Sequence, residues 1–530
     1  MLLLSILLIV VFSIPFVQTG IARIVTNKIN KQYDTNIVVK KVDLSYLGNI
    51  KLKNIEINDH HNDSLIYVDK LTTSLFSSYK NILDNKLEFN EIDLEGVYLY
   101  LKTYKDERND NLSIFVDKFE DKDTTKNNSP PFLLSSSQLH LNDANFYLYD
   151  LNKQEGVIVF YRDIEGYVDD FKIEGPEVYA NIREISLNED HGINITNLTS
   201  NFKYSKTQML FGNTKLETVN SSIVADIVFN YDIKGLADFN NKVNIEANFT
   251  NSDVSLIDLH KFYKELGEND KINFTTILKG TLNDFTLDNL KLISNRNSTI
   301  NGSFHIRNAV NSDNGFSLNA KIYDLSSDYQ NLKQLLPNIL GKNLPTTFGK
   351  LGRFNIAGQS FITNETVDAQ LTINGDIGRI VSDLKLTNIN DIDNAKYDGN
   401  VEFIDLDFGK IVNDSLIGKM SLVALVDGQG FTLEKINTSL KGNVSKYQYK
   451  GYTYNDIDVN GIFKNQNFDG SLISRDKNLK MNFQGLADLS SEIYKFDFIA
   501  DVNYSDFNKL NLFRRDSMAV LKGVMAMKVN

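Results

Sequence analysis

The stretch VNIEANFT, residues 243–250, alternates apolar and polar side chains from its first residue to its last. Successive side chains of a β-strand point to opposite sides of the backbone, so this alternation gathers every apolar side chain on one face. The apolar members are Val243, Ile245, Ala247 and Phe249. The stretch therefore predicts a strand with one apolar face and one polar face.

The same period of two returns along the chain in SIVADIVFNY (222–231), FSLNAKIYDL (316–325), IDVNGIF (457–463), LKMNF (479–483) and FDFIADVNY (496–504). Dipeptides typical of hairpin turns fall between such stretches. These dipeptides are Asn374-Gly375, Asp398-Gly399 and Asp427-Gly428. We therefore predict a mainly β body of antiparallel strands with few short helices. Two of those helices are expected at strand ends, in SLIDLHKFYKEL and NLKQLLPNIL.

A repeated unit emerges when GLADFNNKVNIEANFTNSDVSLIDL, from Gly235, is aligned with GLADLSSEIYKFDFIADVNYSDFNKLNL, from Gly485. The alignment pairs Val243 with Phe496, Ile245 with Phe498, Ala247 with Ala500, Asp253 with Asp506 and Leu259 with Leu512. FSLNAKIYDLSSDYQNL, residues 316–332, is a weaker third copy. Units that bury an apolar face only against their neighbours stack into an elongated body.

Length and composition exclude several classes of protein. The chain has 530 residues, a net charge of -12 and no cysteine. This length predicts several domains or one extended repetitive object. An acidic chain without a basic stripe disfavours nucleic acid as a partner. The absence of cysteine excludes disulfides, a thiolate nucleophile and cysteine-ligated metals.

Residues 2–17, LLLSILLIVVFSIPFV, contain no charged side chain. As a helix they would span about 24 Å, slightly less than a bilayer core of about 30 Å. No basic residue precedes them and no small-residue cleavage site follows, as a removable signal would require. We expect residues 1–18 to be a retained membrane anchor, although the lysines and arginines that follow would by themselves argue for a cytoplasmic tail. Its apolar residues are Leu2, Leu3, Leu4, Ile6, Leu7, Leu8, Ile9, Val10, Val11, Phe12, Ile14, Phe16 and Val17.

The remaining chain divides by composition. Residues 19–34 predict an amphipathic helix, with Ile21, Ile24 and Ile29 on one face. Residues 35–120 form the first β segment, and the polar, proline-containing stretch around SPPF predicts a linker over 121–136. Residues 137–530 carry the repeated β segments, and the chain ends on a strand start, so we expect the array to continue beyond it.

No cluster of residues predicts catalysis. DHHNDS, residues 59–64, holds His60, His61 and Asp63, but neighbouring residues of a strand point apart and could share one ion only across a turn. A polar hairpin turn is the simpler interpretation. No Ser-His-Asp or paired-carboxylate arrangement is evident. We expect a protein that is not an enzyme and that has no catalytic residue, cofactor or bound metal.

Several stretches carry a resemblance to a known family. FVQTGIARIVTNKINKQYDTNIVVKKVDLSYLGNIKLKNIEINDHHNDSLIYVDKL, from Phe16, includes a hairpin pattern between Val42 and Asp59. Further matches are EIDLEGVYLYLKTYKDERNDNLSIFVDKFE, from Glu91, and LKGTLNDFTLDNLKL, from Leu278. The chain resembles the inner-membrane component of the translocation and assembly module, TamB, within the AsmA-like group. The similarity is strongest in the first 120 residues, and the family's C-terminal module has no counterpart here.

The resemblance implies an N-terminal transmembrane helix followed by an elongated, curled β-sheet that forms a groove with a hydrophobic trough. It implies a single-pass protein of the bacterial inner membrane, with the β body in the periplasm. The implied function is conduction of phospholipid between the inner and outer membranes in support of outer-membrane biogenesis. Membrane lipids and an outer-membrane barrel protein of the module would be its partners.

The apolar rows are the candidate groove lining, although alternating strands also build sandwiches and barrels with dry cores. The candidates are Ile223, Ile227, Phe229, Val243, Ile245, Phe249, Leu318, Ile322, Ile457, Val459, Leu479, Met481, Phe483, Phe496, Phe498 and Val502. An alternative function is an assembly scaffold whose exposed strand edges template client outer-membrane barrel proteins and autotransporters during protein secretion. A carbohydrate binder is a weaker alternative, because the chain has no tryptophan.

Overall fold

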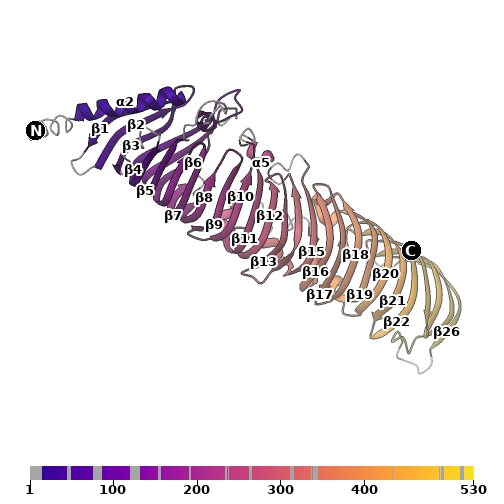
Figure 1. The fold of residues 1–530 in the computed structure, drawn as a ribbon. Coiled ribbons are helices and arrows are strands. Elements are labelled where there is room, and N and C mark those ends of the chain that lie inside the picture. The colour runs from indigo at the N-terminus through magenta and orange to yellow at the C-terminus, as the bar shows by residue number, and fades with distance from the viewer. Residues whose placement is uncertain are drawn as a thin grey trace, which may run out of the picture. The chain divides into compact units, whose positions relative to one another are not determined.

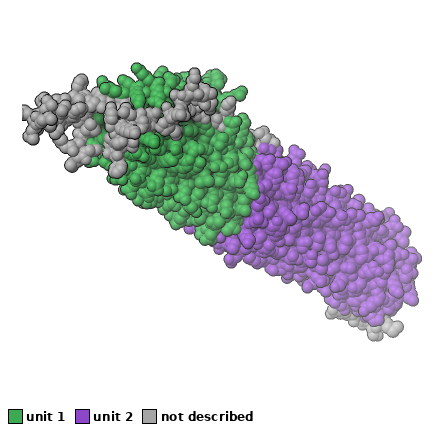
Figure 2. Space-filling model, in the orientation of Figure 1, with its two compact units in different colours: residues 1–254, 275–283 green, residues 255–274, 284–530 purple. Residues whose placement is uncertain are grey.

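The computed structural model describes residues 15–44, 49–75, 86–119, 132–152, 157–189, 192–232, 236, 238–261, 266–308, 310, 315–335, 337, 344–432, 434–488, 490, 495–513 and 519–529. The chain divides into two compact units (Figure 2). Unit 1 comprises residues 1–254 and 275–283, and unit 2 comprises residues 255–274 and 284–530. The described part contains 26 strands, so the predicted mainly β fold is confirmed.

Unit 1 is a ladder of strands that pair in chain order from β1 to β11 (Figure 1). Its strands are β1 (Asn36–Leu44), β2 (Asn49–Asn58), β3 (Ser64–Leu75), β4 (Lys86–Thr103), β5 (Leu133–Asp150), β6 (Val157–Glu174), β7 (Glu177–Glu189), β8 (Asn194–Tyr204), β9 (Gln208–Thr218), β10 (Ser222–Asn230) and β11 (Asn244–Ser255). Its helices are α2 (Pro15–Tyr33), α4 (Asn111–Asp117) and α5 (Phe239–Lys242). Strand β12 (Lys271–Thr281) has residues in both units.

Unit 2 is an antiparallel ladder in chain order from β13 to β26. Its strands are β13 (Asp284–Ser294), β14 (Thr299–Arg307), β15 (Ser317–Asp328), β16 (Arg353–Thr363), β17 (Thr366–Gly375), β18 (Gly378–Thr387), β19 (Lys396–Asp407), β20 (Ile417–Gln429), β21 (Asn437–Tyr449), β22 (Tyr452–Lys464), β23 (Asn467–Asp476), β24 (Leu479–Asp488), β25 (Lys495–Asp506) and β26 (Val520–Val529). Its helices are α6 (Leu256–His260), α7 (Tyr329–Leu335), η3 (Thr346–Lys350), η4 (Ile389–Asn394) and α9 (Phe408–Val412). Each ladder is an open sheet.

One pair of strands corrects the prediction of a wholly antiparallel sheet. Strands β4 and β5 run parallel, from Lys86 opposite Leu133 to Thr103 opposite Asp150. Parallel neighbours require a crossover of a dozen or more residues, and α4 lies in the segment between β4 and β5. Strand β5 begins at Leu133, so the last positions of the predicted linker, 133–136, belong to a strand instead.

Bulges bend the strands at asparagine and aspartate residues. Asn213, Asn289 and Asp405 have left-handed backbones, with φ of 50°, 53° and 46°. Each lies where the pairing register shifts. A bulge adds one residue to a strand, bends it and increases its twist. Asparagine and aspartate tolerate this conformation better than other residues with a side chain.

Two predicted hairpin turns are wrong. Asp398-Gly399 lies inside β19 and Asp427-Gly428 lies inside β20. Gly399 has a φ of 141°, a conformation that only glycine adopts easily, so here it permits a bend in the middle of a strand. Asn374-Gly375 closes β17 directly before a turn, as expected.

Short helices begin directly at the ends of several strands that have the same length. Strands β11, β15 and β19 each have 12 residues and run directly into α6, α7 and α9. Strand β25 also has 12 residues and runs into a turn that buries Leu510 completely. The first three of these strands are spaced four strands apart. The helices predicted at strand ends are confirmed as α6 and α7, whose Leu256, Leu332 and Leu335 are buried.

Candidate functional site

An apolar row crosses unit 1 at right angles to its strands. Backbone pairing joins each member to the next, from β1 to β10. Nine steps of about 4.8 Å give this row a length of about 43 Å. We call it row A, and its members are Val42, Leu52, Leu71, Leu94, Leu141, Gly166, Ile185, Leu198, Leu216 and Ile223.

Two neighbouring rows cross unit 2 from β13 to β26. No member is charged, and only Ser360 and Ser382 are polar. Row B is Leu287, Phe304, Ala320, Ser360, Ala369, Leu384, Gly399, Val426, Leu440, Gly461, Gly470, Gly485, Phe498 and Met527. Row C is Leu290, Gly302, Ile322, Gly358, Leu371, Ser382, Val401, Ala424, Gly442, Val459, Leu472, Phe483, Ala500 and Met525.

The opposite face of unit 2 carries the charges. Arg475 donates to Asp456 and Asp458 at 3.3 and 2.5 Å, and these three residues alternate with members of the apolar rows along their strands. Lys528 of β26 pairs with Asp497 of β25 at 3.3 Å on the same side. The sheet therefore separates an uncharged apolar face from a face that carries the charges together with exposed apolar side chains such as Leu425 and Ile499.

The aromatic side chains on the apolar face of β24 and β25 are half-buried. Phe483 and Phe498 lie in contact, with ring centroids 4.9 Å apart, and neither ring is fully buried. Phe496 and Phe468 extend this aromatic group at 6.0 and 6.4 Å from Phe498 and Phe483. The small members Ala500 and Val459 of row C are buried. A continuous apolar surface that keeps partial solvent exposure is a typical binding site for an apolar ligand.

The apolar face of unit 1 is packed more tightly near its first strands. Val39, Val42, Ile55 and Val68 form a buried cluster, against which Leu94 and Val97 pack. A second cluster at Leu139, Val168 and Ala180 also contacts Leu94. Large branched side chains on neighbouring strands bury one another here. Row A therefore begins in a buried cluster at Val42, and its next members, Leu52, Leu71 and Leu94, are half-buried.

The structure places every predicted lining residue on the apolar face of its own unit, but not all of them are open. Val243 and Ile245 are buried in a cluster with Tyr231, covered by Phe239 of α5. These two residues pack a core. Sequence reasoning missed most of row A, because its members come from many strands and only the pairing register brings them into line.

The predicted anchor lies mostly outside the described residues. Leu2 to Ile14 are not described, and α2 starts at Pro15. Among the helices that the structure describes, none combines the length and the hydropathy needed to cross a membrane. Helix α2 covers the region predicted to be amphipathic, and its Ile24 is exposed.

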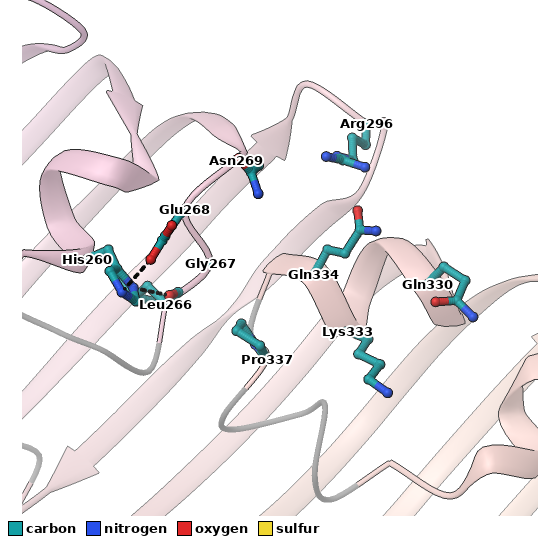
Figure 3. Close-up of a pocket in the computed structure, with 10 residues that line it drawn as sticks. All are labelled: His260, Leu266, Gly267, Glu268, Asn269, Arg296, Gln330, Lys333, Gln334 and Pro337. Carbon is teal, nitrogen blue, oxygen red and sulfur yellow. Dashed lines mark hydrogen bonds and ion pairs between the residues drawn. The ribbon is translucent and has the colours of Figure 1, made fainter.

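A hollow of 530 Å³ lies in unit 2 between the 266–269 segment and α7 (Figure 3). Its polar groups are already engaged: His260 lies 2.9 Å from Glu268 and 2.6 Å from the carbonyl oxygen of Leu266, and Arg296 donates to Asp270 at 2.5 Å. The remaining rim is formed by Asn269, Gln330, Lys333, Gln334 and Pro337. None of its lining residues belongs to row B or row C, so this hollow is separate from the apolar face.

No family model matches the chain, and no curated protein matches it significantly.

Proposed function

We propose that the apolar faces of this protein bind the acyl chains of phospholipids and conduct them between the inner and outer membranes. The observation that carries the proposal is the pair of uncharged rows, B and C, which continue over 14 strands of unit 2. A site for one small ligand does not need a surface of this length. A path along which a long apolar molecule moves needs a surface of this length.

The energy of transfer favours such a path. Each buried CH₂ group is worth about 0.8 kcal/mol, so exposing a 16-carbon chain to water costs about 13 kcal/mol. A half-buried row that contains phenylalanine and leucine side chains removes part of this cost of exposure along its whole length.

The bulges at Asn289 and Asp405 support a curled sheet whose apolar face lies on the inside. Curling would let the strands shield a lipid chain from water while the polar face, with its ion pairs, stays in solvent. A curled sheet of this kind would match the trough that the family resemblance implies.

The resemblance of the first 120 residues to TamB supports a location in the inner membrane, with the β body in the periplasm. The uncharged stretch at residues 2–17 would be the anchor. Helix α2, with exposed Ile24 beside exposed Arg23, would lie along the membrane surface. An outer-membrane barrel protein would be the partner at the far membrane.

Photocrosslinking from neighbouring positions on opposite faces tests the proposal. Phe498 lies on row B, whereas Ile499 is the next residue and points to the polar face, where it is 59% exposed. Benzoylphenylalanine is placed at each position in cells fed radiolabelled phosphate. We expect labelled phospholipid adducts at Phe498 and at least tenfold fewer at Ile499.

A matched pair of charges tests transport itself. Phe498→Glu places a carboxylate on the lipid path, and Ile499→Glu adds the same group to the polar face. We expect Phe498→Glu to block lipid supply to the outer membrane and Ile499→Glu to leave it unchanged. Equal supply in both variants, with a folded protein, would reject lipid conduction. Crosslinks to outer-membrane protein strands without lipid would favour the assembly scaffold.

A further inference from the structure

Two histidines and a glutamate meet at one edge of unit 1. His60 Nε2 lies 2.9 Å from Glu107 Oε2, and His61 Nε2 lies 2.7 Å from Glu107 Oε1. The potential ligand atoms of the three residues all lie within 4.8 Å of one another. The histidines belong to the turn between β2 and β3, and the glutamate follows β4, so the cluster joins two separate segments.

His60 and His61 lie in the turn between β2 and β3, so their side chains need not point to opposite sides as they would in a strand. Asp59 N–H donates to the carbonyl of Asp63, Asn62 N–H donates to the carbonyl of Asp59, and Asn62 has a φ of 63°. The polar turn predicted from the sequence is therefore confirmed. Its geometry brings the rings of His60 and His61 to a centroid separation of 4.4 Å, on the same side.

A hydrogen-bond network fixes both segments. Tyr104 donates from its hydroxyl to Asp59 and Asp63 at 2.7 and 2.9 Å, and its ring lies 4.0 Å from that of His61. Asn111, which is fully buried, donates to Asp59 at 2.9 Å. These partners hold the carboxylate of Asp59, which in turn accepts from the backbone N–H of His61.

The second segment is held at Glu107. Asn152 donates from its side chain to the carbonyls of Tyr104 and Glu107, which sets the loop that carries the glutamate. Lys102 forms an ion pair with the carboxylate of Asp63 at 3.2 Å. Asp59 and Asp63 add two further carboxylates to the turn that carries the histidines.

We infer that His60, His61 and Glu107 form a site for a divalent transition-metal cation, of which Zn²⁺ is the best fit. Two imidazole nitrogens and one carboxylate oxygen are a common protein ligand set for zinc, with a fourth position left for water. Ligand atoms around a tetrahedral zinc lie about 3.3 Å apart, so the three side chains need only small rotations. The bound ion would link the β2–β3 turn to the segment that starts the parallel crossover from β4 to β5.

Metal titration of the full chain in detergent tests this site. The protein is stripped with a chelator and titrated with Zn²⁺ against a chromophoric indicator. We expect about one tight Zn²⁺ per chain, and a loss of at least about tenfold in affinity for His61→Gln and for Glu107→Gln. His305→Gln is the matched control, because His305 pairs with Asp284 at 2.5 Å in unit 2 without a second histidine.

The visible absorption of bound Co²⁺ tests whether these residues ligate the ion or only support the fold around it. Co²⁺ in place of Zn²⁺ should give the strong visible absorption of a tetrahedral site in the parent protein and in His305→Gln, and should lose it in His61→Gln. Circular dichroism checks that each variant is folded. The inference is overturned if the parent protein takes up no Zn²⁺, or if folded His61→Gln and Glu107→Gln bind it as tightly as the parent.

Discussion

The two units build their apolar faces from the same alternation but fill them differently. Row A of unit 1 contains one glycine among valine, leucine and isoleucine, and its first member, Val42, is buried in a cluster with Val68. Rows B and C of unit 2 intersperse glycine, alanine and serine with phenylalanine, and their large rings stay half-buried. Large branched side chains close a curled sheet into a core. In unit 2, the alternation of large and small residues leaves the large rings partly exposed.

This contrast separates stability from binding. A residue in the sealed part of unit 1 contributes mainly to the free energy of unfolding, because nothing but protein contacts it. A residue on the open part of unit 2 contributes less to that free energy and remains available to a ligand. The following predictions sharpen this difference, from the largest expected effect to the smallest.

The same charge should have different costs on the two faces. Val68 is 6% exposed, so Val68→Glu buries an unpaired carboxylate and should destabilise unit 1 by about 4 kcal/mol. Phe498→Glu should destabilise unit 2 by about 1–2 kcal/mol, because its new carboxylate keeps contact with water. Hydrogen exchange of peptides from each unit measures the two losses separately. Equal losses would remove the distinction between a sealed face and an open one.

An added methyl group should destabilise the protein where neighbouring strands approach each other closely. A Cβ atom at Gly442, on row C, would lie 2.1 Å from the carbonyl oxygen of Val423 and 2.6 Å from Cβ of Ala424. A Cβ atom at Gly212 in unit 1 would meet nothing closer than 3.4 Å. Gly442→Ala should therefore destabilise unit 2 by about 1–3 kcal/mol.

Gly212→Ala is the matched control for this substitution. Its effect on unit 1 should stay within about 0.5 kcal/mol, because the new methyl group makes ordinary contacts. The denaturant midpoints of both variants, followed by the exchange of peptides from the substituted strand, measure the difference. A tolerated Gly442→Ala would show that row C has space beneath the glycine.

Low pH should lower the free energy of unfolding of both units, because aspartates at strand ends become protonated. Burial alone would raise the pKa of Asp476, but hydrogen bonds from Tyr452 and from the N–H groups of Asn478 and Asn455 outweigh it and hold that pKa below its ordinary value. Asp59 in unit 1 is arranged alike: burial would raise its pKa, and hydrogen bonds from Asn111 and Tyr104 lower it.

A lowered pKa in the folded state stabilises the protein above the ordinary aspartate value of 3.8, and this stability is lost as the pH falls through the folded pKa. We expect the denaturant midpoint of unit 2 to fall below about pH 4, and Asp476→Asn to flatten this dependence. Asp469→Asn, an exposed change on the same strand, is the control and should leave the slope unchanged. An unaltered slope in Asp476→Asn would assign the acid sensitivity to other carboxylates.

The bulges explain which parts of the apolar face the sequence could predict. A strict period of two assigns Phe403 and Leu406 to opposite faces, but the bulge at Asp405 resets the alternation. Both residues therefore face the same side, and Leu406 is buried. A left-handed aspartate inside a strand has no distinctive sequence pattern, and neither does the parallel pairing of β4 with β5. The contact of Glu107 with His60 and His61 was missed for a related reason, since Glu107 lies 46 residues from His61.

The sequence by itself determined the mainly β fold and the face on which each predicted lining residue lies, because alternation depends only on the local geometry of an extended chain. It also determined that short helices follow some strands, since leucines at helical spacing are a local signal. Only the tertiary structure decided which strands pair, which parts of the apolar face are sealed and which histidines meet a carboxylate. These features depend on register and on contacts between residues far apart in the chain, and no local pattern specifies them.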